Sequence, residues 1–257
     1  MSLRVGVTGA EGRMGREILQ AAADRDVDVA FAVNRSPGDT RVAGVEVEDA
    51  ADFEELVGER DVDVVVDFTG PESSVRYAAA CAATDVPIVV GTTGFDEADV
   101  SSLREAGEAV PILLGANFSR GVQALLDAVE SAVGNLPSYD VEVTETHHNQ
   151  KRDAPSGTAK VILDRIVETR DDEETEYVHG REGDQPREAG EIGVHARRAG
   201  DVTGEHEVLL AGNHEVLELT HRAGDRGVFA AGALDAAAWA ANADAGFYRF
   251  EEVASEL

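Results

Sequence analysis

The sequence predicts an α/β protein in which a parallel sheet covered by helices is joined to an inserted α+β domain with a mixed sheet. Up to residue 118, short apolar runs alternate with stretches of helical periodicity, which favours parallel strands joined by right-handed crossovers. After residue 119, several strand patterns follow one another and are separated by turn residues. With 257 residues, the chain is long enough for two such domains.

The first predicted strand, residues 3–8, leads into a glycine-rich turn and then into a helical pattern. Glycines at such a turn let a pyrophosphate approach the backbone and rest on the N-terminus of the following helix. Gly9, Gly12 and Gly15 occupy the turn, and the strand and helix on either side of it are both present. This combination predicts a Rossmann-type dinucleotide-binding domain; the alternative is an ordinary tight turn.

The second predicted strand, residues 27–33, indicates which cofactor is bound. An acidic residue after this strand usually binds the ribose 2′-OH of NAD, whereas an arginine suits the 2′-phosphate of NADP. The chain has Asn34 and Arg35 at this place, which favours NADPH as the preferred cofactor and leaves NADH possible. The alternative for Arg35 is a simple surface charge.

Three further apolar runs predict strands, and a polar or glycine-rich segment follows each of them. Because the carboxyl ends of parallel strands meet at one edge of a sheet, these segments are expected to line a cofactor groove. Any one of them alone could be an ordinary turn. The strands are residues 62–67, 87–90 and 112–114, the segments are 68–71, 91–95 and 115–119, the helices are 52–58, 72–83 and one through Leu103, and residues 37–50 are expected to be irregular.

The second half of the chain predicts an antiparallel-rich sheet with two helices, followed by a last helix. The last helix is rich in alanine and is expected to return to the first domain. The dinucleotide-binding domain is therefore placed at residues 1–118 and 227–257, and the substrate-binding domain at 119–226. The strands are residues 141–144, 192–197, 205–210 and 216–220, the helices begin near Val122, just after Ser156 and at Phe229, and an acidic loop is expected over 171–176.

Residues 145–158 carry the most chemistry in the chain. Ser156 is a good N-cap, and Gly157 leaves the first N–H groups of the next helix uncovered, so this end attracts anions. His147 and Lys151 precede it, and Lys151 is one of only two lysines, the other being Lys160. A compact, titratable ammonium beside a histidine indicates proton transfer near an anionic ligand. The alternative is a solvated loop before a capped helix.

Composition excludes several classes of function. The 51 acidic and 22 basic residues give a formal net charge of −29, which argues against nucleic-acid binding. With so few lysines, this acidic surface is typical of a halophilic protein in a high-salt cytoplasm. Cys81 is the only cysteine, so neither an internal disulfide nor a cysteine-based zinc site is possible, and no metal site is predicted. The sequence indicates an intracellular protein without a membrane span.

These motifs together resemble the 4-hydroxy-tetrahydrodipicolinate reductase family, also called the dihydrodipicolinate reductases, of the diaminopimelate route to lysine. The resemblance covers nearly the whole chain, and the stretch 147–158 is its most specific part. One departure is Asn34, where many members of the family carry an acid. The matching motifs are residues 9–15, 67–69, 91–95, 116–119, 147–158 and 198–201.

The resemblance implies an oxidoreductase that reduces a small dicarboxylate with NAD(P)H, and a homotetramer built through the second domain. It implies His147 as general acid or base with Lys151 as proton donor, and His148, Gly157 and Thr158 as ligands of a substrate carboxylate. Two other functions stay open: another pyridine-nucleotide-dependent reductase of a small acid, and a non-catalytic NADP(H) sensor. The implied cofactor-binding residues are Gly9, Ala10, Glu11, Gly12, Arg13, Met14, Asn34, Arg35, Gly91, Thr92, Thr93, Gly115, Ala116, Asn117 and Phe118.

Overall fold

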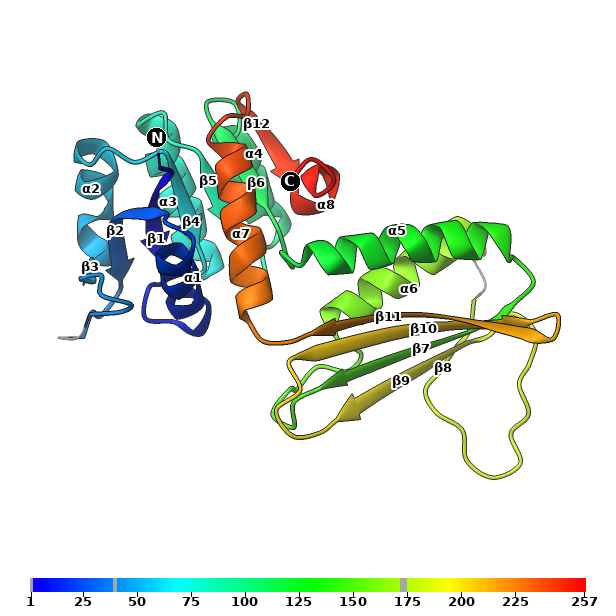
Figure 1. Cartoon of the computed structure of the whole chain (residues 1–257). Helices are drawn as coiled ribbons and strands as arrows, with labels where there is room; N and C mark the ends of the chain where they lie inside the picture. Colours follow the sequence, from blue (N-terminus) through cyan, green and yellow to red (C-terminus); the bar gives the residue numbers. More distant parts are fainter. Residues whose placement is uncertain (1, 39–40, 172–174) are drawn as a thin grey trace. The chain divides into compact units, whose positions relative to one another are not determined.

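The computed structural model of the protein describes residues 2–38, 41–171 and 175–257. The chain forms two compact units (Figure 1). The first unit runs to Ser119 and includes Arg226–Leu257, and the second unit comprises Arg120–Asp225. Each unit has its own sheet and its own apolar core. Among the described residues, no helix is both long and apolar enough to cross a membrane.

The first unit contains a parallel sheet of seven strands in the order β3-β2-β1-β4-β5-β6-β12. The strand order reverses beside β1, and in such sheets a ligand binds at the carboxyl ends of the strands next to this point. This confirms the Rossmann-type prediction. The strands are β1 (Arg4–Thr8), β2 (Asp28–Asn34), β3 (Glu48–Asp49), β4 (Val64–Asp67), β5 (Ile88–Val90), β6 (Pro111–Leu114) and β12 (Gly246–Arg249).

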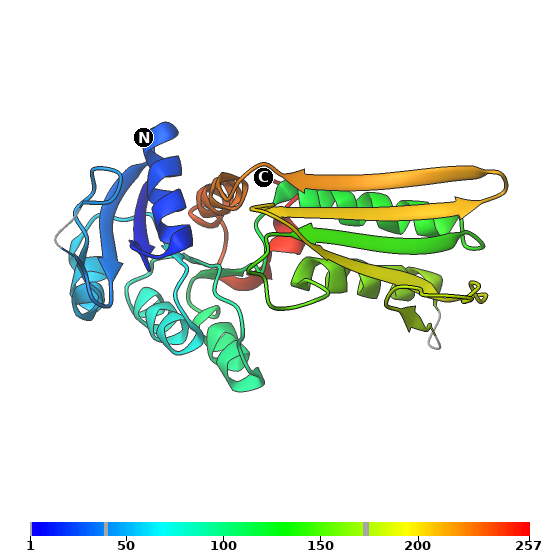
Figure 2. The same cartoon turned by 90° about the horizontal axis from the view of Figure 1, so that it is seen from below.

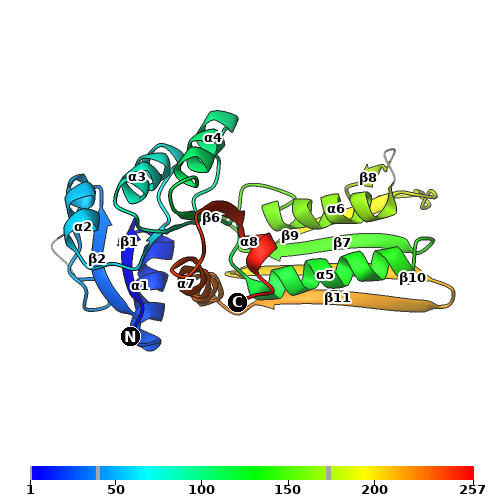
Figure 3. The same ribbon diagram turned by 90° about the horizontal axis from the view of Figure 1, so that it is seen from above.

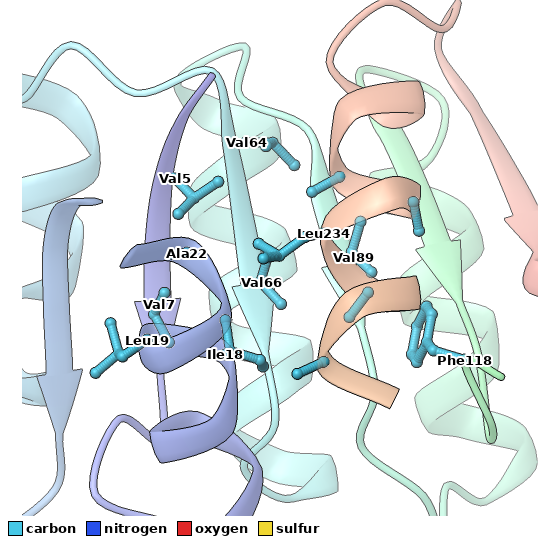
Figure 4. Packing of buried hydrophobic residues seen from close by; sticks show 14 of the residues in the cluster. Val5, Val7, Ile18, Leu19, Ala22, Val64, Val66, Val89, Phe118 and Leu234 are labelled. Carbon is cyan, nitrogen blue, oxygen red and sulfur yellow. The ribbon is translucent and has the colours of Figure 1, made fainter. Parts of the chain in front are cut away.

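Helices cover both faces of this sheet, which explains why its strands are apolar on both sides. On one face, α1 (Arg13–Asp24) and α7 (Gly227–Ala240) pack on β1 and β4, with Ile18 and Leu234 meeting Val66 (Figure 4). On the other face lie α2 (Phe53–Glu59), α3 (Pro71–Ala83) and α4 (Glu97–Ala106). Helix α7 packs closely against Phe118, in the segment after β6, because Gly232 has no side chain. A Cβ at Gly232 would lie 1.8 Å from the carbonyl oxygen of Phe118.

Four short elements of the first unit were not predicted. Within the segment 37–50, expected to be irregular, β3 is only two residues long, and the 3₁₀ turn η1 (Ala50–Asp52) follows it. At the C-terminus, β12 and α8 (Phe250–Val253) have four residues each. Elements this short carry no periodicity, and pairing with β2 and β6 defines the two strands. Residues 39–40 of the segment lie outside the described residues.

The second unit contains a mixed sheet of five strands in the order β11-β10-β7-β9-β8. Strand β10 is antiparallel to β7 and β11, whereas β9 is parallel to β7 and β8. The predicted mixed sheet is confirmed, although the two-residue β8 was not predicted, and residues 172–174 of the expected acidic loop lie outside the described residues. The strands are β7 (Asp140–His147), β8 (Tyr177–Val178), β9 (Ile192–Arg198), β10 (Gly204–Gly212) and β11 (Glu215–Ala223).

Helices α5 (Arg120–Asn135) and α6 (Gly157–Arg170) lie side by side on one face of the mixed sheet (Figures 2 and 3). Val141 and Val143 of β7 point into the core beneath them. Because side chains alternate along a strand, Glu145 and His147 share the face of these two valines. Both polar side chains are therefore buried at the end of an otherwise apolar face, at 1% and 9% exposure.

Candidate active site

The glycine-rich turn of the first unit has the geometry of a phosphate site. Gly9 has φ +70°, and a Cβ on Gly15 would lie 2.2 Å from the carbonyl oxygen of Gly9, so side chains are excluded at both positions. Helix α1 begins after Gly12, and no side chain among the described residues caps it. Its first N–H groups are therefore available to an anion, and the turn fits the pyrophosphate of a dinucleotide.

A cavity of about 250 Å³ lies beside this turn. Asn34 and Arg35, at the end of β2, line it together with Gly9 and Gly12. The structure thus brings the glycine turn and the two residues expected to meet the adenosine ribose to one place. The predicted segment 68–71 supplies three more lining residues, Phe68, Thr69 and Gly70, whereas sequence reasoning did not identify Ser73 and Tyr77, which belong to α3 and are near β2 only in the fold.

A buried aspartate organises the carboxyl ends of three neighbouring strands. Asp67, at the end of β4, is fully buried and accepts hydrogen bonds from Thr8 of β1 at 2.5 Å and from Thr92 after β5 at 3.0 Å. Thr69 and Ser74 also donate to it, at 2.6 and 2.5 Å. Burial raises the pKa of Asp67, and these hydroxyls offset that effect only in part. The network ties these strand ends together at the rim of the candidate cofactor site.

The other predicted cofactor residues differ in what they can offer a ligand. Gly91 lies against Phe68, whose ring would be 2.2 Å from a Cβ, and the hydroxyl of Thr92 is committed to Asp67. Ala10 and Phe118 are buried, and Phe118 packs on Phe250 in the core. These residues can meet a cofactor mainly through their backbone. Residues exposed or half-buried at the surface are Glu11, Arg13, Met14, Thr93, Ala116 and Asn117, whereas Gly115 is buried.

In the second unit, a buried carboxylate holds the imidazole of His147. Glu145 Oε2 lies 2.6 Å from His147 Nδ1, and Arg198 of β9 donates to both carboxylate oxygens of Glu145 at 2.7 Å. The backbone N–H of Ser156 donates to Glu145 Oε1 at 3.1 Å. This arrangement makes Nδ1 of His147 a donor and leaves Nε2 as the nitrogen that can exchange a proton. The sequence alone gave no reason to assign a role in this arrangement to Glu145 or Arg198.

The start of α6 is tied to the same group of side chains. The Oγ of Ser156 accepts from the N–H of Ala159 at 3.2 Å, which confirms it as the N-cap, and it shares a hydrogen bond of 3.0 Å with Nε2 of His206 on β10. The rings of His206 and His147 meet edge to face with centroids 5.3 Å apart. Gly157 faces open space, with no heavy atom of the described residues within 4 Å of a Cβ built there.

The loop between β7 and α6 carries the lysine. Lys151 is 22% exposed and forms an ion pair with Asp153 at 2.9 Å. The loop is fastened to the turn after β9, because the N–H of Asn149 donates to Gly200 and the guanidinium of Arg198 donates to the carbonyl oxygen of Asp153. His148 is half-buried, and its Nδ1 accepts from the N–H of Gln150 at 3.3 Å. The predicted substrate residues therefore lie on this loop and on the first turn of α6.

Burial governs the protonation of these groups. It lowers the pKa of His147, and the charges of Lys151 and Arg198 act in the same direction, whereas Glu145 opposes them. Burial, with the neighbouring His147, lowers the pKa of His206 to about 4. For Glu145, burial alone would raise the pKa, but Arg198 and His147 together bring it below its ordinary value. At neutral pH the cluster thus contains a carboxylate and two largely neutral imidazoles.

Comparisons with known proteins agree with this geometry. A family model described as dihydrodipicolinate reductase, N-terminus, matches residues 3–118, and one described as dihydrodipicolinate reductase, C-terminus, matches residues 121–254. The chain is 54% identical over 250 residues to the 4-hydroxy-tetrahydrodipicolinate reductase of Haloarcula marismortui, covering 97% of this chain and 98% of the relative. It is also 54% identical to that of Natronomonas pharaonis, covering 97% and 99%.

Among solved structures, the fold is similar to a dipicolinate-bound dihydrodipicolinate reductase from Paenisporosarcina sp. TG-14. The TM-score is 0.81 at 24% identity, and the match covers 98% of this chain and 100% of the other. An amine dehydrogenase from Mycobacterium smegmatis has the same general fold, with a TM-score of 0.64 at 15% identity over 96% of this chain and 94% of the other. At these identities the likeness supports the fold alone.

Proposed function

The chain belongs to the dihydrodipicolinate reductase family, and on this premise we propose which of its residues perform the reaction. It is an oxidoreductase with 4-hydroxy-tetrahydrodipicolinate reductase activity in lysine biosynthesis, and its family uses NAD(P)H. The observation that carries the proposal is the hydrogen bond of 2.6 Å between buried Glu145 and His147, on the same connection as Lys151 and the start of α6. A non-catalytic sensor would not need such a proton-handling group.

In the proposal, the residues of the first unit bind and orient the cofactor. Bound NAD(P)H supplies a hydride to a ring carbon of the substrate. Gly9, Gly12 and the N-terminus of α1 hold the pyrophosphate, and Asn34 with Arg35 meets the adenosine ribose. The nicotinamide half is assigned to residues 115–118 and to Gly91, Thr92 and Thr93, and the Asp67 network holds Thr92 in place.

The second unit supplies the proton and binds the substrate carboxylate. Loss of the 4-hydroxyl group as water leaves a ring double bond conjugated with the C=N group. Hydride addition to this system leaves negative charge on the nitrogen, which must gain a proton. Because burial keeps His147 largely neutral at pH 7, the ammonium of Lys151 is the proposed source of that proton, which reaches the substrate directly or through Nε2 of His147. His148, Thr158 and the open N-terminus at Gly157 are proposed to bind the carboxylate. Such local donors are needed because the net charge of −29 repels a dianionic substrate.

Replacing Glu145 by Gln tests whether this carboxylate positions His147. We expect kcat to fall roughly ten- to hundredfold, because a carboxylate that orients a functional histidine contributes about that much. We also expect unfolding free energy to fall by about 3 kcal/mol, since an unpaired Arg198 would remain. Because the pKa of Glu145 is lowered in the folded state, this stability difference is full above the unfolded value of 4.5 and is lost as the pH falls through the folded value.

Glu142→Gln is the matched control for Glu145→Gln. Glu142 lies on the same strand and also pairs with a histidine and an arginine, His195 at 2.7 Å and Arg187, but on the opposite face of the sheet. It should lose stability without a comparable loss of kcat. Steady-state kinetics give kcat, and denaturant melts from pH 7 to well below the unfolded value of 4.5 give the stability difference and its loss in acid. Equal kcat in the two variants would show that Glu145 only stabilises the fold.

Preference for NADPH over NADH is proposed from the residues that follow β2. Strand β2 ends in Asn34 rather than in an acid that would itself repel a 2′-phosphate, and Arg35 lines the cavity where that phosphate would lie. A charge-assisted hydrogen bond contributes about 1.5 to 3 kcal/mol, which is roughly 10- to 150-fold in affinity. Arg35→Ala should reduce the ratio of kcat/KM for NADPH to kcat/KM for NADH, mainly by raising KM for NADPH. Asn34→Glu should shift preference toward NADH. If Arg35→Ala leaves this ratio unchanged, the 2′-phosphate lies elsewhere.

Two further parts of the proposal concern the state of the protein. A homotetramer built through the second unit is supported by the mixed sheet, whose β11 exposes Val216 at 59% and Leu217 at 36%. The helices described in this unit lie on one face of that sheet (Figure 3). Light scattering at working salt measures the mass of this assembly.

A cytoplasmic location is supported by Cys81, the single thiol, which is free and fully buried.

A further inference from the structure

Glu11, in the middle of the glycine-rich turn, connects that turn to the segment after β2. Its Oε2 accepts a hydrogen bond from Nδ2 of Asn34 at 3.2 Å. Its Oε1 accepts from the backbone N–H of Gly38 at 3.0 Å. One carboxylate therefore binds two residues that lie 23 and 27 positions further along the chain. The bridge places a negative charge directly beside Asn34.

The position of this charge matters because Asn34 and Arg35 line the cavity next to the turn. In dinucleotide-binding sheets, the ribose 2′-OH is usually bound by an acid that stands at the end of the second strand itself. That strand ends at Asn34 here, and the carboxylate of Glu11 reaches the same residue from the turn. Arg35 thus brings to the cavity a guanidinium, which attracts a 2′-phosphate, and the Glu11 carboxylate bonded to the lining residue Asn34 brings a charge that repels it.

We propose that Glu11 is a specificity-determining residue for the cofactor, and that it opposes Arg35. The Glu11 carboxylate takes over the role of the missing acid at the end of β2: it accepts a hydrogen bond from the ribose 2′-OH of NADH and disfavours the 2′-phosphate of NADPH. It keeps NADH usable and limits the advantage that Arg35 gives to NADPH. This inference rests on the proposed cofactor site, since both place the adenosine ribose at Asn34.

Glu11→Gln removes the charge while keeping an amide that can bond to Asn34 or Gly38. The effect of one partly exposed charge on a neighbouring phosphate should be roughly 3- to 10-fold in affinity. We expect the variant to bind adenosine 2′,5′-bisphosphate about that much more tightly, and 5′-AMP equally or more weakly. Isothermal titration calorimetry of the full-length protein with these two probes reads the ribose site without any turnover. The gain should shrink as salt rises from 0.1 M toward 1 M, because screening weakens the repulsion.

Two companion variants separate this inference from the proposed cofactor site. Asp24→Asn, at the far end of α1, makes the same change in net charge and should leave the ratio of the two affinities unchanged. Arg35→Ala should weaken only the bisphosphate. The role of Glu11 is overturned, while the cofactor site stands, in two cases. In the first, Arg35→Ala changes the ratio of the two affinities and Glu11→Gln does not. In the second, Glu11→Gln weakens binding of both probes alike. If neither variant changes the ratio, the ribose lies elsewhere and both proposals are wrong.

Discussion

Replacing His147 by Gln should lower kcat by roughly 10² to 10⁴, the usual range for the loss of a group that transfers a proton in the transition state. Gln can still accept or donate one hydrogen bond to Glu145, so the buried carboxylate keeps a partner and the fold is expected to persist. Affinity for NADPH should be nearly unchanged, because the proposed cofactor residues belong to the first unit. Steady-state kinetics with freshly generated 4-hydroxy-tetrahydrodipicolinate and fluorescence titration with NADPH measure the two quantities.

The control for this variant is His195→Gln on the neighbouring strand β9. His195 pairs with Glu142 and lies on the face of the sheet opposite to His147. The His195→Gln variant should keep kcat within about twofold of wild type, since surface changes away from a site have small effects. Near-normal kcat in His147→Gln, or an equal loss in His195→Gln, would remove His147 from the proposed mechanism.

The fold was predictable wherever a local pattern repeated. Apolar strands that alternate with helices predicted the Rossmann-type unit, and the buried runs 64–67 and 88–90 are fully buried strands in the structure. The missed strands, β3, β8 and β12, are two to four residues long and exist because a neighbour pairs with them. Pairing across distant parts of the chain leaves no periodic signal in so short a segment.

Residue types marked the candidate site, but only the fold shows how they cooperate. The stretch 145–158 stood out because it combines histidines, a lysine and a helix start. Arg198, which binds Glu145 and acts on the pKa of His147, comes from β9, 53 residues after Glu145, and no spacing rule connects the two. An imidazole with its ordinary pKa would be an adequate acid near pH 7, but burial makes His147 largely neutral. The structure therefore shifts the proposed proton source toward Lys151.

Replacing Lys151 by Met should also lower kcat by roughly 10² to 10⁴, because the ammonium is the proposed proton donor. KM for the substrate should rise too, since a cation that offsets carboxylate charge is lost. Lys151→Arg separates these two effects. Arginine keeps the positive charge but holds its proton too tightly to release it, so it should restore KM and leave kcat low. The ion pair with Asp153 can still form in the arginine variant.

Lys160→Met is a matched control, because Lys151 and Lys160 are the only lysines of the chain. Lys160 is exposed on the first turn of α6, and its loss makes the same change in net charge. The kcat of the Lys160→Met variant should stay within about twofold of wild type. Steady-state kinetics of all three variants at one salt concentration provide the comparison. If arginine at position 151 restored kcat as well as KM, Lys151 would act through its charge alone, and the proton would have to come from another group of the cluster, because a guanidinium does not give it up at neutral pH.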